Sequence, residues 1–195
     1  GYVETHGRAE TEFLLFSLPQ LERKKITYKG FELEEMDTDA ILEQKPDLVV
    51  VDELAHSNAP GSRHKKRYLD VLEILEKGID VYSAVNVQHI ESLADTVSQI
   101  TGVMIKETIP DSILDAADEI ELLDISPDEL LQRLADVKVY TADKTKDAVE
   151  NFFRKGNITA LREMALRLVS DRVDRQLHDY MQNKRIRGPW KSGLH

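Results

Sequence analysis

The first 140 residues alternate between short apolar runs and stretches with apolar side chains at helical spacing. Residues 47–52 (DLVVVD) form a continuous apolar run, which is typical of a parallel strand buried on both faces. Residues 66–78 predict an amphipathic helix that ends at Gly78. Further strand and helix pairs are expected at 79–85 and 88–102, 103–109 and 110–118, and 119–125 and 126–134. The alternation predicts an α/β domain with a mostly parallel sheet and helices on both faces.

The start of the chain predicts more elements by the same criteria. They are a strand over 1–5, a helix over 6–18, a hairpin or extended stretch over 24–36 and a short helix over 37–45. Apolar and polar residues alternate around Lys29 and Gly30, which places the hairpin turn there. Asp37 is the expected N-cap of the short helix. Ser126, Pro127 and Glu129 predict a capping box at the start of the helix over 126–134.

The pattern becomes purely helical from about residue 141. We expect a sensor domain over 1–140, a helical extension over 141–185 and a basic tail or linker over 186–195. Within the extension, helices are predicted over 146–156 and 157–185, the second with Asn157 as its N-cap. The longer helix could pack on the sheet or extend toward a partner.

Composition narrows the class of protein. Apolar residues make up 41% of the 195 residues, which is enough for a substantial core. No apolar run approaches the roughly 18 residues of a membrane span, and no signal-peptide pattern opens the chain. There are no cysteines, which excludes disulfides, thiolate metal sites and cysteine nucleophiles. The net charge of −10 disfavours a general nucleic-acid-binding surface.

Two acids, Asp52 and Glu53, follow the apolar strand directly. Ligands of open parallel sheets bind beyond the carboxyl ends of the strands. An apolar strand that ends in Asp-Glu has the form of a Walker B segment, in which the Asp holds Mg²⁺ and the Glu can polarise a water. Alternatively, the two acids mark the point where a strand meets solvent.

Polar residues cluster after the other predicted strands as well. They are Glu4, Thr5, His6 and Arg8 after the first strand, His56, Asn58 and His64 after Asp52, and Asn86, Gln88 and His89 further on. The histidines could hold a transition metal, or they could form loop hydrogen bonds; none has the spacing of a zinc protease. The basic run of Arg63, Lys65, Lys66 and Arg67 could meet phosphates or form the solvated start of a helix.

A phosphate-binding loop of the form Gly-x-x-x-x-Gly-Lys-Ser/Thr does not occur in the sequence. Such a loop normally follows the first strand of a nucleotide-binding sheet. We therefore expect the missing strand and loop to lie upstream of Gly1, so that this chain is a fragment of a longer protein.

Five segments carry a resemblance in order and spacing: residues 1–8, 47–67, 78–93, 100–134 and 151–167. Together they resemble the N-terminal cytoplasmic domain of the KdpD-type sensor histidine kinases, the osmosensitive potassium sensors of bacteria. The resemblance implies a P-loop NTPase-like sensor domain that binds ATP and Mg²⁺. Asp52 and Glu53 match the family's Walker B position, with Asp52 as the Mg²⁺ ligand. His56, Asn58, Arg63 and His64 fall in its next loop, and Asn86, Gln88 and His89 in its next strand-end motif.

The resemblance also implies the biological setting. The whole protein would phosphorylate itself on a histidine outside this chain and pass the phosphoryl group to the response regulator KdpE, which controls a potassium-uptake operon. This chain would be a cytoplasmic part of an inner-membrane protein, with no membrane or nucleic-acid contact of its own. Its partners would be other domains of the kinase or a stress protein. Two alternatives stay open: a nucleotide-independent interaction module, and a hydrolase in which Glu53 activates water.

Overall fold

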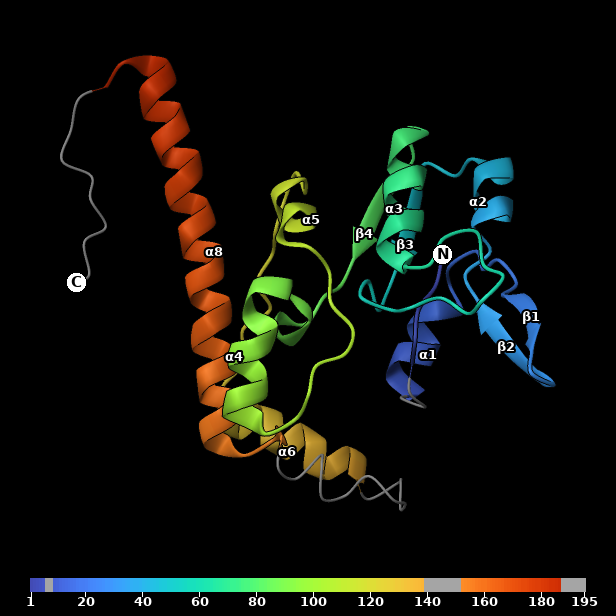
Figure 1. Ribbon diagram of the computed structural model, residues 1–195, viewed down its shortest axis with the longest axis horizontal. Coiled ribbons are helices and arrows are strands. Elements are labelled where there is room, and N and C mark those ends of the chain that lie inside the picture. Colours follow the sequence, from blue (N-terminus) through green and yellow to red (C-terminus); the bar gives the residue numbers. More distant parts are fainter. Residues whose placement is uncertain (6–8, 139–151, 187–195) are drawn as a thin grey trace. The chain divides into compact units, whose positions relative to one another are not determined.

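The computed structural model describes residues 1–5, 9–138 and 152–186 (Figure 1). The chain divides into two compact units, Gly1–Ser98 with Met104–Ala116, and Gln99–Val103 with Ala117–His195. The part of the chain that the structure describes contains no helix with the length and hydropathy of a membrane span. The chain is a mixed α/β protein whose strands form two small sheets.

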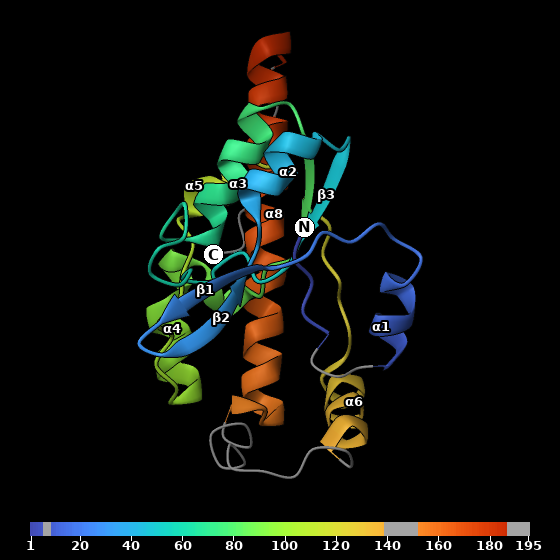
Figure 2. The same cartoon turned by 90° about the vertical axis from the view of Figure 1, so that its right-hand side faces the viewer.

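The first sheet is an antiparallel hairpin of β1 (Lys24–Tyr28) and β2 (Phe31–Glu35) (Figure 2). Lys29 and Gly30 both have positive φ angles, 49° and 83°, as a two-residue hairpin turn requires. The predicted hairpin is therefore confirmed. Most of its side chains are exposed, and Glu35 at its end is buried.

The second sheet pairs β3 (Leu48–Val51) in parallel with β4 (Asp80–Ser83). Tyr2 adds a parallel bridge to Val51 on the other side of β3, so the predicted first strand amounts to a single bridge. Val49 and Val51 are buried, whereas Leu48 and Val50 are about 40% exposed. The prediction of a strand buried on both faces is wrong, because the described residues cover only one face of β3.

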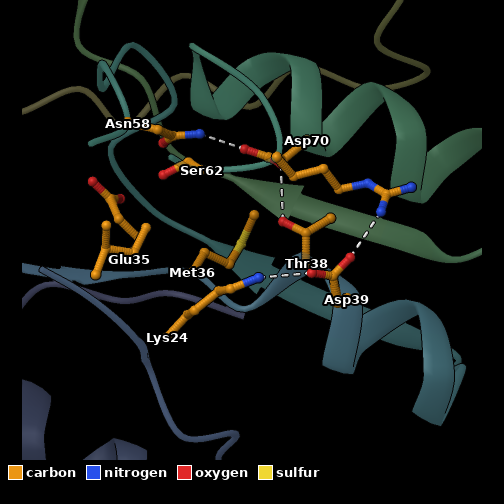
Figure 3. A pocket seen from close by; sticks show the side chains of 10 residues that line it. Lys24, Glu35, Met36, Thr38, Asp39, Asn58, Ser62 and Asp70 are labelled. Carbon is orange, nitrogen blue, oxygen red and sulfur yellow. Dashed lines mark hydrogen bonds and ion pairs between the residues drawn. The ribbon is translucent and has the colours of Figure 1, made fainter. Parts of the chain in front are cut away.

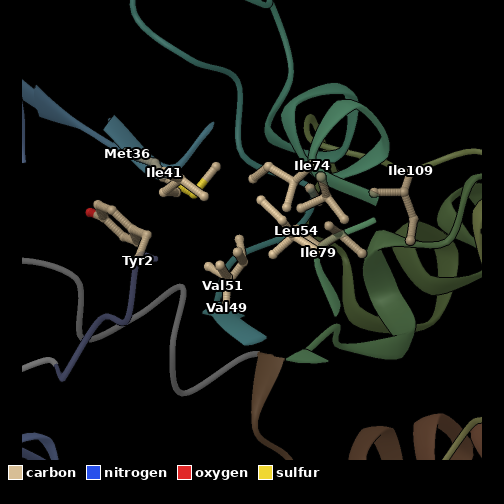
Figure 4. Close-up of a cluster of buried hydrophobic side chains, with 11 residues drawn as sticks. Tyr2, Met36, Ile41, Val49, Val51, Leu54, Ile74, Ile79 and Ile109 are labelled. Carbon is tan, nitrogen blue, oxygen red and sulfur yellow. The ribbon is translucent and has the colours of Figure 1, made fainter. Parts of the chain in front are cut away.

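Two helices cover the buried face of β3. The helix α2 (Thr38–Gln44) begins as predicted, with the Asp37 carboxylate accepting a hydrogen bond from the Ala40 amide at 3.0 Å. The helix α3 (Arg67–Glu76) is followed by Gly78 at φ 77°. Figure 4 shows the resulting core, in which Val49 and Val51 meet aliphatic side chains of both helices. The core residues include Tyr2, Met36, Ile41, Val49, Val51, Leu54, Val71, Ile74, Ile79 and Ile109.

Four further elements complete the first unit or begin in it. They are α1 (Ala9–Leu15), the 3₁₀ turn η1 (Val87–His89), α4 (Glu91–Thr101) and α5 (Asp111–Asp115). The predicted strand over 103–109 is wrong: only Ile109 pairs, by one parallel bridge to Ile90. A strand needs a neighbouring strand that pairs with several of its residues in turn. Residues 103–108 have no such neighbour among the described residues.

The regular elements in the described residues of the second unit are helices. It contains α6 (Pro127–Lys138) and the thirty-residue α8 (Lys155–Lys184). Residues 119–125 are irregular rather than a strand, so that prediction is also wrong. Asn157 lies within the first turn of α8 instead of capping it, because the helix begins two residues earlier. The helix predicted over 146–156 lies mostly outside the described residues, and the tail over 186–195 does so except for Ile186.

Candidate functional site

The acid pair lies at the carboxyl end of β3, as the sequence predicts. The Asp52 carboxylate accepts hydrogen bonds from the Glu53 amide at 2.8 Å and the Glu4 amide at 3.4 Å. The Asp52 amide donates to the Tyr2 carbonyl at 2.6 Å. Glu53 has a φ of 52°, which is uncommon for a residue other than glycine and costs backbone strain. Two parallel segments therefore orient the Asp52 carboxylate, and the chain turns sharply directly after it.

Arg67, the first residue of α3, connects this pair to the interior. Its side chain is 0% exposed. The guanidinium donates to the Glu53 carboxylate at 3.4 Å, to the Asp52 carbonyl at 3.3 Å and to the Glu35 carboxylate at 3.2 Å. The same guanidinium stacks on the Tyr2 ring, 3.9 Å from its centroid. One buried cation thus holds two carboxylates from separate segments, and no pattern in the sequence predicts its burial.

Glu35 joins the hairpin to the loop that follows the acid pair. One of its carboxylate oxygens lies 3.1 Å from the His56 ring nitrogen and accepts a bond from the Ala59 amide at 2.7 Å. The other accepts from Arg67. His56 therefore contacts the hairpin directly through Glu35 and is part of the hydrogen-bonded network around Arg67.

Asn58 connects the loop after β3 to the helix α3 (Figure 3). Its side-chain amide donates to the Asp70 carboxylate at 2.6 Å and to the His64 carbonyl at 3.0 Å. Thr38 also donates to Asp70, at 3.0 Å. Burial raises the pKa of Asp70, although both hydrogen bonds oppose that shift. The adjoining cavity of about 10 Å³ holds one water at most, so Asn58 has a structural role here rather than an open ligand pocket.

Arg63 and His64 point to α3 and α2 and not to the acid pair. Both contact the Glu73 carboxylate, His64 at 2.8 Å, and Arg63 also binds Asp39 at 2.7 Å. These contacts lower the pKa of Glu73 to about 2. The open groove beside them, about 490 Å³, is also lined by Glu73 and Glu76, whose charges oppose phosphate binding. The structure thus separates these two candidates from Asp52 and Glu53.

The third strand-end group lies in and beside η1. Asn86 occupies the N-cap position without a side-chain cap bond, Gln88 lies within the turn, and the His89 ring nitrogen is 2.8 Å from the Glu107 carbonyl. The Glu107 carboxylate accepts the Ser57 amide at 2.7 Å, which brings this turn beside the loop after β3. Burial acts to raise the pKa of Glu107, but bonds from Ser57 and the charges of His56 and Lys66 bring it below its usual value. His6 and Arg8 lie outside the described residues.

The donor atoms present suit Mg²⁺ better than a transition metal. Within the described ranges, no group of three or more His, Cys, Asp or Glu side chains could hold a metal ion. Mg²⁺ commonly takes one or two carboxylates and fills its remaining positions with water and phosphate oxygens. Asp52 and the partly exposed Glu53 could supply the one or two carboxylates of such a Mg²⁺ site. The histidines lie apart and do not fit a transition-metal site.

Comparison of the sequence with known proteins identifies the family of this chain. A family model described as "KdpD: Osmosensitive K+ channel His kinase sensor domain" matches residues 1–173. A protein of Escherichia coli named "Sensor protein KdpD" is 55% identical over 177 residues, which cover 91% of this chain and 20% of that protein. Proteins with the same name are 53% identical over 174 residues in Clostridium acetobutylicum and 48% identical over 190 residues in Mycobacterium tuberculosis.

The Clostridium match covers 89% of this chain and 19% of the relative, and the Mycobacterium match covers 97% and 22%. The chain therefore spans about a fifth of the length of these curated relatives. The resemblance noted in the sequence is confirmed. The chain belongs to the KdpD family of osmosensitive potassium-system sensor kinases and corresponds to its sensor domain.

Proposed function

We propose that this chain is a regulatory domain that binds ATP with Mg²⁺ and forms part of a two-component sensor kinase for potassium uptake. The observation that carries the proposal is the placement of Asp52 and Glu53 at the carboxyl end of a parallel strand. In sheets of this kind, that end is where phosphate ligands and their metal ions bind. The fold proposed is that of a P-loop NTPase, completed by a phosphate-binding loop outside these 195 residues.

The contacts of the acid pair support this role. Two backbone amides orient the Asp52 carboxylate without neutralising it, because an amide carries no net charge. Arg67 is shared between Glu35 and Glu53, so the charge of the cluster remains negative and attracts a divalent cation. Asp52 would bind Mg²⁺ directly or through water, and the metal would carry the β- and γ-phosphates.

The wider role is proposed from the family. The whole protein would transfer a phosphoryl group from its own histidine to the response regulator KdpE, and this domain would adjust that activity in the cytoplasm beside a membrane-anchored kinase. In this proposal the phosphoryl-transfer residues lie in the other kinase domains, and this domain would act on them through contact.

The proposal is tested by calorimetric titration of ATP–Mg²⁺. The chain is compared with a version extended upstream through the expected phosphate-binding loop. Asp52→Asn in the extended version should weaken binding at least about tenfold, as the loss of one charged ligand contact does. Asp47→Asn is the matched control, because Asp47 is exposed just before the opposite end of β3. If neither length binds, or if both substitutions have equal effects, the proposal fails.

One further observation favours the interaction-module alternative. Phe13, Leu14 and Phe16, in and just after α1, are 66–83% exposed, and Val173, Leu177 and Tyr180 on α8 are 41–56% exposed. Large apolar side chains gathered on one element are typical of contact surfaces. In that case, partner binding would persist in Asp52→Asn and would not respond to ATP–Mg²⁺.

A further inference from the structure

We infer that the Lys66 ammonium, paired with the Ser57 hydroxyl, is the phosphate-binding group contributed by the loop after the acid pair. The inference rests on the proposed nucleotide function and assigns a residue that binds the phosphates. The ligand class is a nucleoside polyphosphate with Mg²⁺. The family resemblance implied Arg63 and His64 as ligand residues of this loop, whereas the basic run that includes Lys66 could either meet phosphates or form the solvated start of a helix.

The first step concerns Arg63, His64 and Arg67, the basic side chains of this segment that have carboxylate partners. Arg63 binds the carboxylates of Glu73 and Asp39, and His64 shares Glu73. Arg67 is fully buried and already holds two carboxylates. A phosphate could recruit any of these three side chains only by breaking ion pairs, and removing Arg67 would strand buried charges.

Lys66 has different partners. Its ammonium donates to the Ser57 hydroxyl at 2.7 Å and approaches the Ala55 carbonyl at 3.4 Å. Both acceptors are neutral, and Ala55 is two residues beyond Glu53 along the chain. Lys66 is half-buried and Ser57 is exposed, so a ligand can reach the pair from solvent. A phosphate oxygen is a much stronger acceptor for an ammonium than a hydroxyl, because the bond is then between opposite charges.

The backbone holds the pair in place. Ser57 and Lys66 form an antiparallel bridge that closes the loop, and the Asn58 amide donates to the Lys65 carbonyl at 3.1 Å. The Arg67 amide donates to the His56 carbonyl at 3.1 Å. Ser57 therefore sits opposite Lys66, which immediately precedes the arginine that contacts Glu53. The loop that carries Ser57 and Lys66 thus begins directly after Glu53 and ends directly before Arg67.

Glu107 sets the charge around the pair. Its carboxylate accepts the Ser57 amide, and Lys66 is among the charges that lower its pKa. Glu107 thus compensates part of the Lys66 charge when no ligand is present. An anion that binds the Lys66 ammonium must compete with the Glu107 carboxylate for its positive charge.

The test uses ATP–Mg²⁺ titrations of the upstream-extended chain and of three variants made in it. Lys66→Met should weaken ATP–Mg²⁺ binding by about tenfold to a hundredfold, the usual effect of losing a hydrogen bond to a charged group. Lys66→Arg should recover much of that loss because it keeps the charge. Arg63→Gln, the matched control within the same basic run, should leave the affinity within about threefold of wild type. Circular dichroism at the titration temperature verifies that each variant is folded.

A second readout does not depend on affinity. Amine labelling followed by mass spectrometry should show Lys66 protected by ATP–Mg²⁺ in the wild-type protein, while Lys25, exposed on the hairpin, should label equally with and without ligand. If the wild type binds but Lys66→Met has no effect and Lys66 is not protected, the inference is overturned while the proposed function stands. If the wild type does not bind ATP–Mg²⁺ at all, the proposed function fails and the inference fails with it.

Discussion

Replacement of Arg67 by methionine tests the central network directly. Methionine keeps much of the side-chain length and removes the charge. The substitution deletes the contacts of the guanidinium with Glu35 at 3.2 Å and Glu53 at 3.4 Å, together with its stacking on Tyr2. Glu35, only 6% exposed, would remain as a buried carboxylate without its guanidinium partner.

The expected loss in the free energy of unfolding is about 3–5 kcal/mol, the usual cost of removing one partner of a buried ion pair. For a chain of this size that corresponds to a fall in Tm of roughly 6–20 °C. Urea and thermal denaturation followed by circular dichroism measure both quantities. Lys25→Met is the control, because its pairing with Glu32 is exposed on both sides and should be worth less than about 1 kcal/mol.

The double variant Arg67→Met with Glu35→Gln separates charge from packing. Because it removes the stranded carboxylate as well, it should be more stable than Arg67→Met alone, and the cycle completed with Glu35→Gln should give an interaction energy of about 0.5–3 kcal/mol. The reasoning is refuted if Arg67→Met stays within about 1 kcal/mol of wild type. It is equally refuted if the double variant is no more stable than the single one.

Two further predictions concern acid stability and helix capping. Arg63 and His64 lower the pKa of Glu73 from 4.5 to about 2, so its contribution to stability is complete above pH 4.5 and is lost as the pH falls toward 2. The stability difference between wild type and Glu73→Gln should therefore shrink over that interval, and a difference that is constant with pH would contradict the assignment. Asp37→Ala removes the cap of α2 and should cost about 1 kcal/mol in thermal unfolding, whereas Asp37→Asn, which can still accept the Ala40 amide, should cost less.

Local signals in the sequence were sufficient for the elements whose hydrogen bonds are local. The hairpin turn at Lys29 and Gly30, the cap at Asp37 and the terminal Gly78 are confirmed, because each depends on residues close in the chain. The start of α6 is confirmed in part. The Glu129 amide does donate to the Ser126 hydroxyl at 3.2 Å, but the Glu129 carboxylate pairs with Arg133 at 2.6 Å.

Long-range features could not be obtained in this way. A run such as residues 47–52 shows that a strand is apolar but not which of its faces another element covers. Strands over 103–109 and 119–125 depend on a neighbour that local pattern cannot specify. Helical spacing in α3 predicts one apolar face of Tyr68, Val71, Leu72 and Leu75, of which Val71 is buried and Leu75 is 44% exposed. The same spacing misses Arg67 and Asp70, which are buried because distant partners satisfy them.

The candidate site shows the same division. The placement of Asp52 and Glu53 at a strand end followed from the order of residues, and the structure agrees. The partners of those acids did not follow, since Glu35 and Tyr2 are far from them in sequence and carry no motif. Arg63 and His64 looked like ligands because they are basic and lie near Asp52 in the chain, yet their nearest carboxylates are on α2 and α3.

The burial of Glu35 has a consequence for how the hairpin finds its pairing. Along β2 the four residues before Glu35 are exposed, so no apolar face distinguishes the native alignment with β1 from one shifted by a single residue. A shift of that kind turns every side chain to the opposite face of the hairpin. It would carry Glu35 away from Arg67, His56 and the Ala59 amide at once. The contacts of the Glu35 carboxylate, together with the turn at Gly30, therefore make a misaligned hairpin less stable than the native one. In most sheets, buried aliphatic side chains have this role.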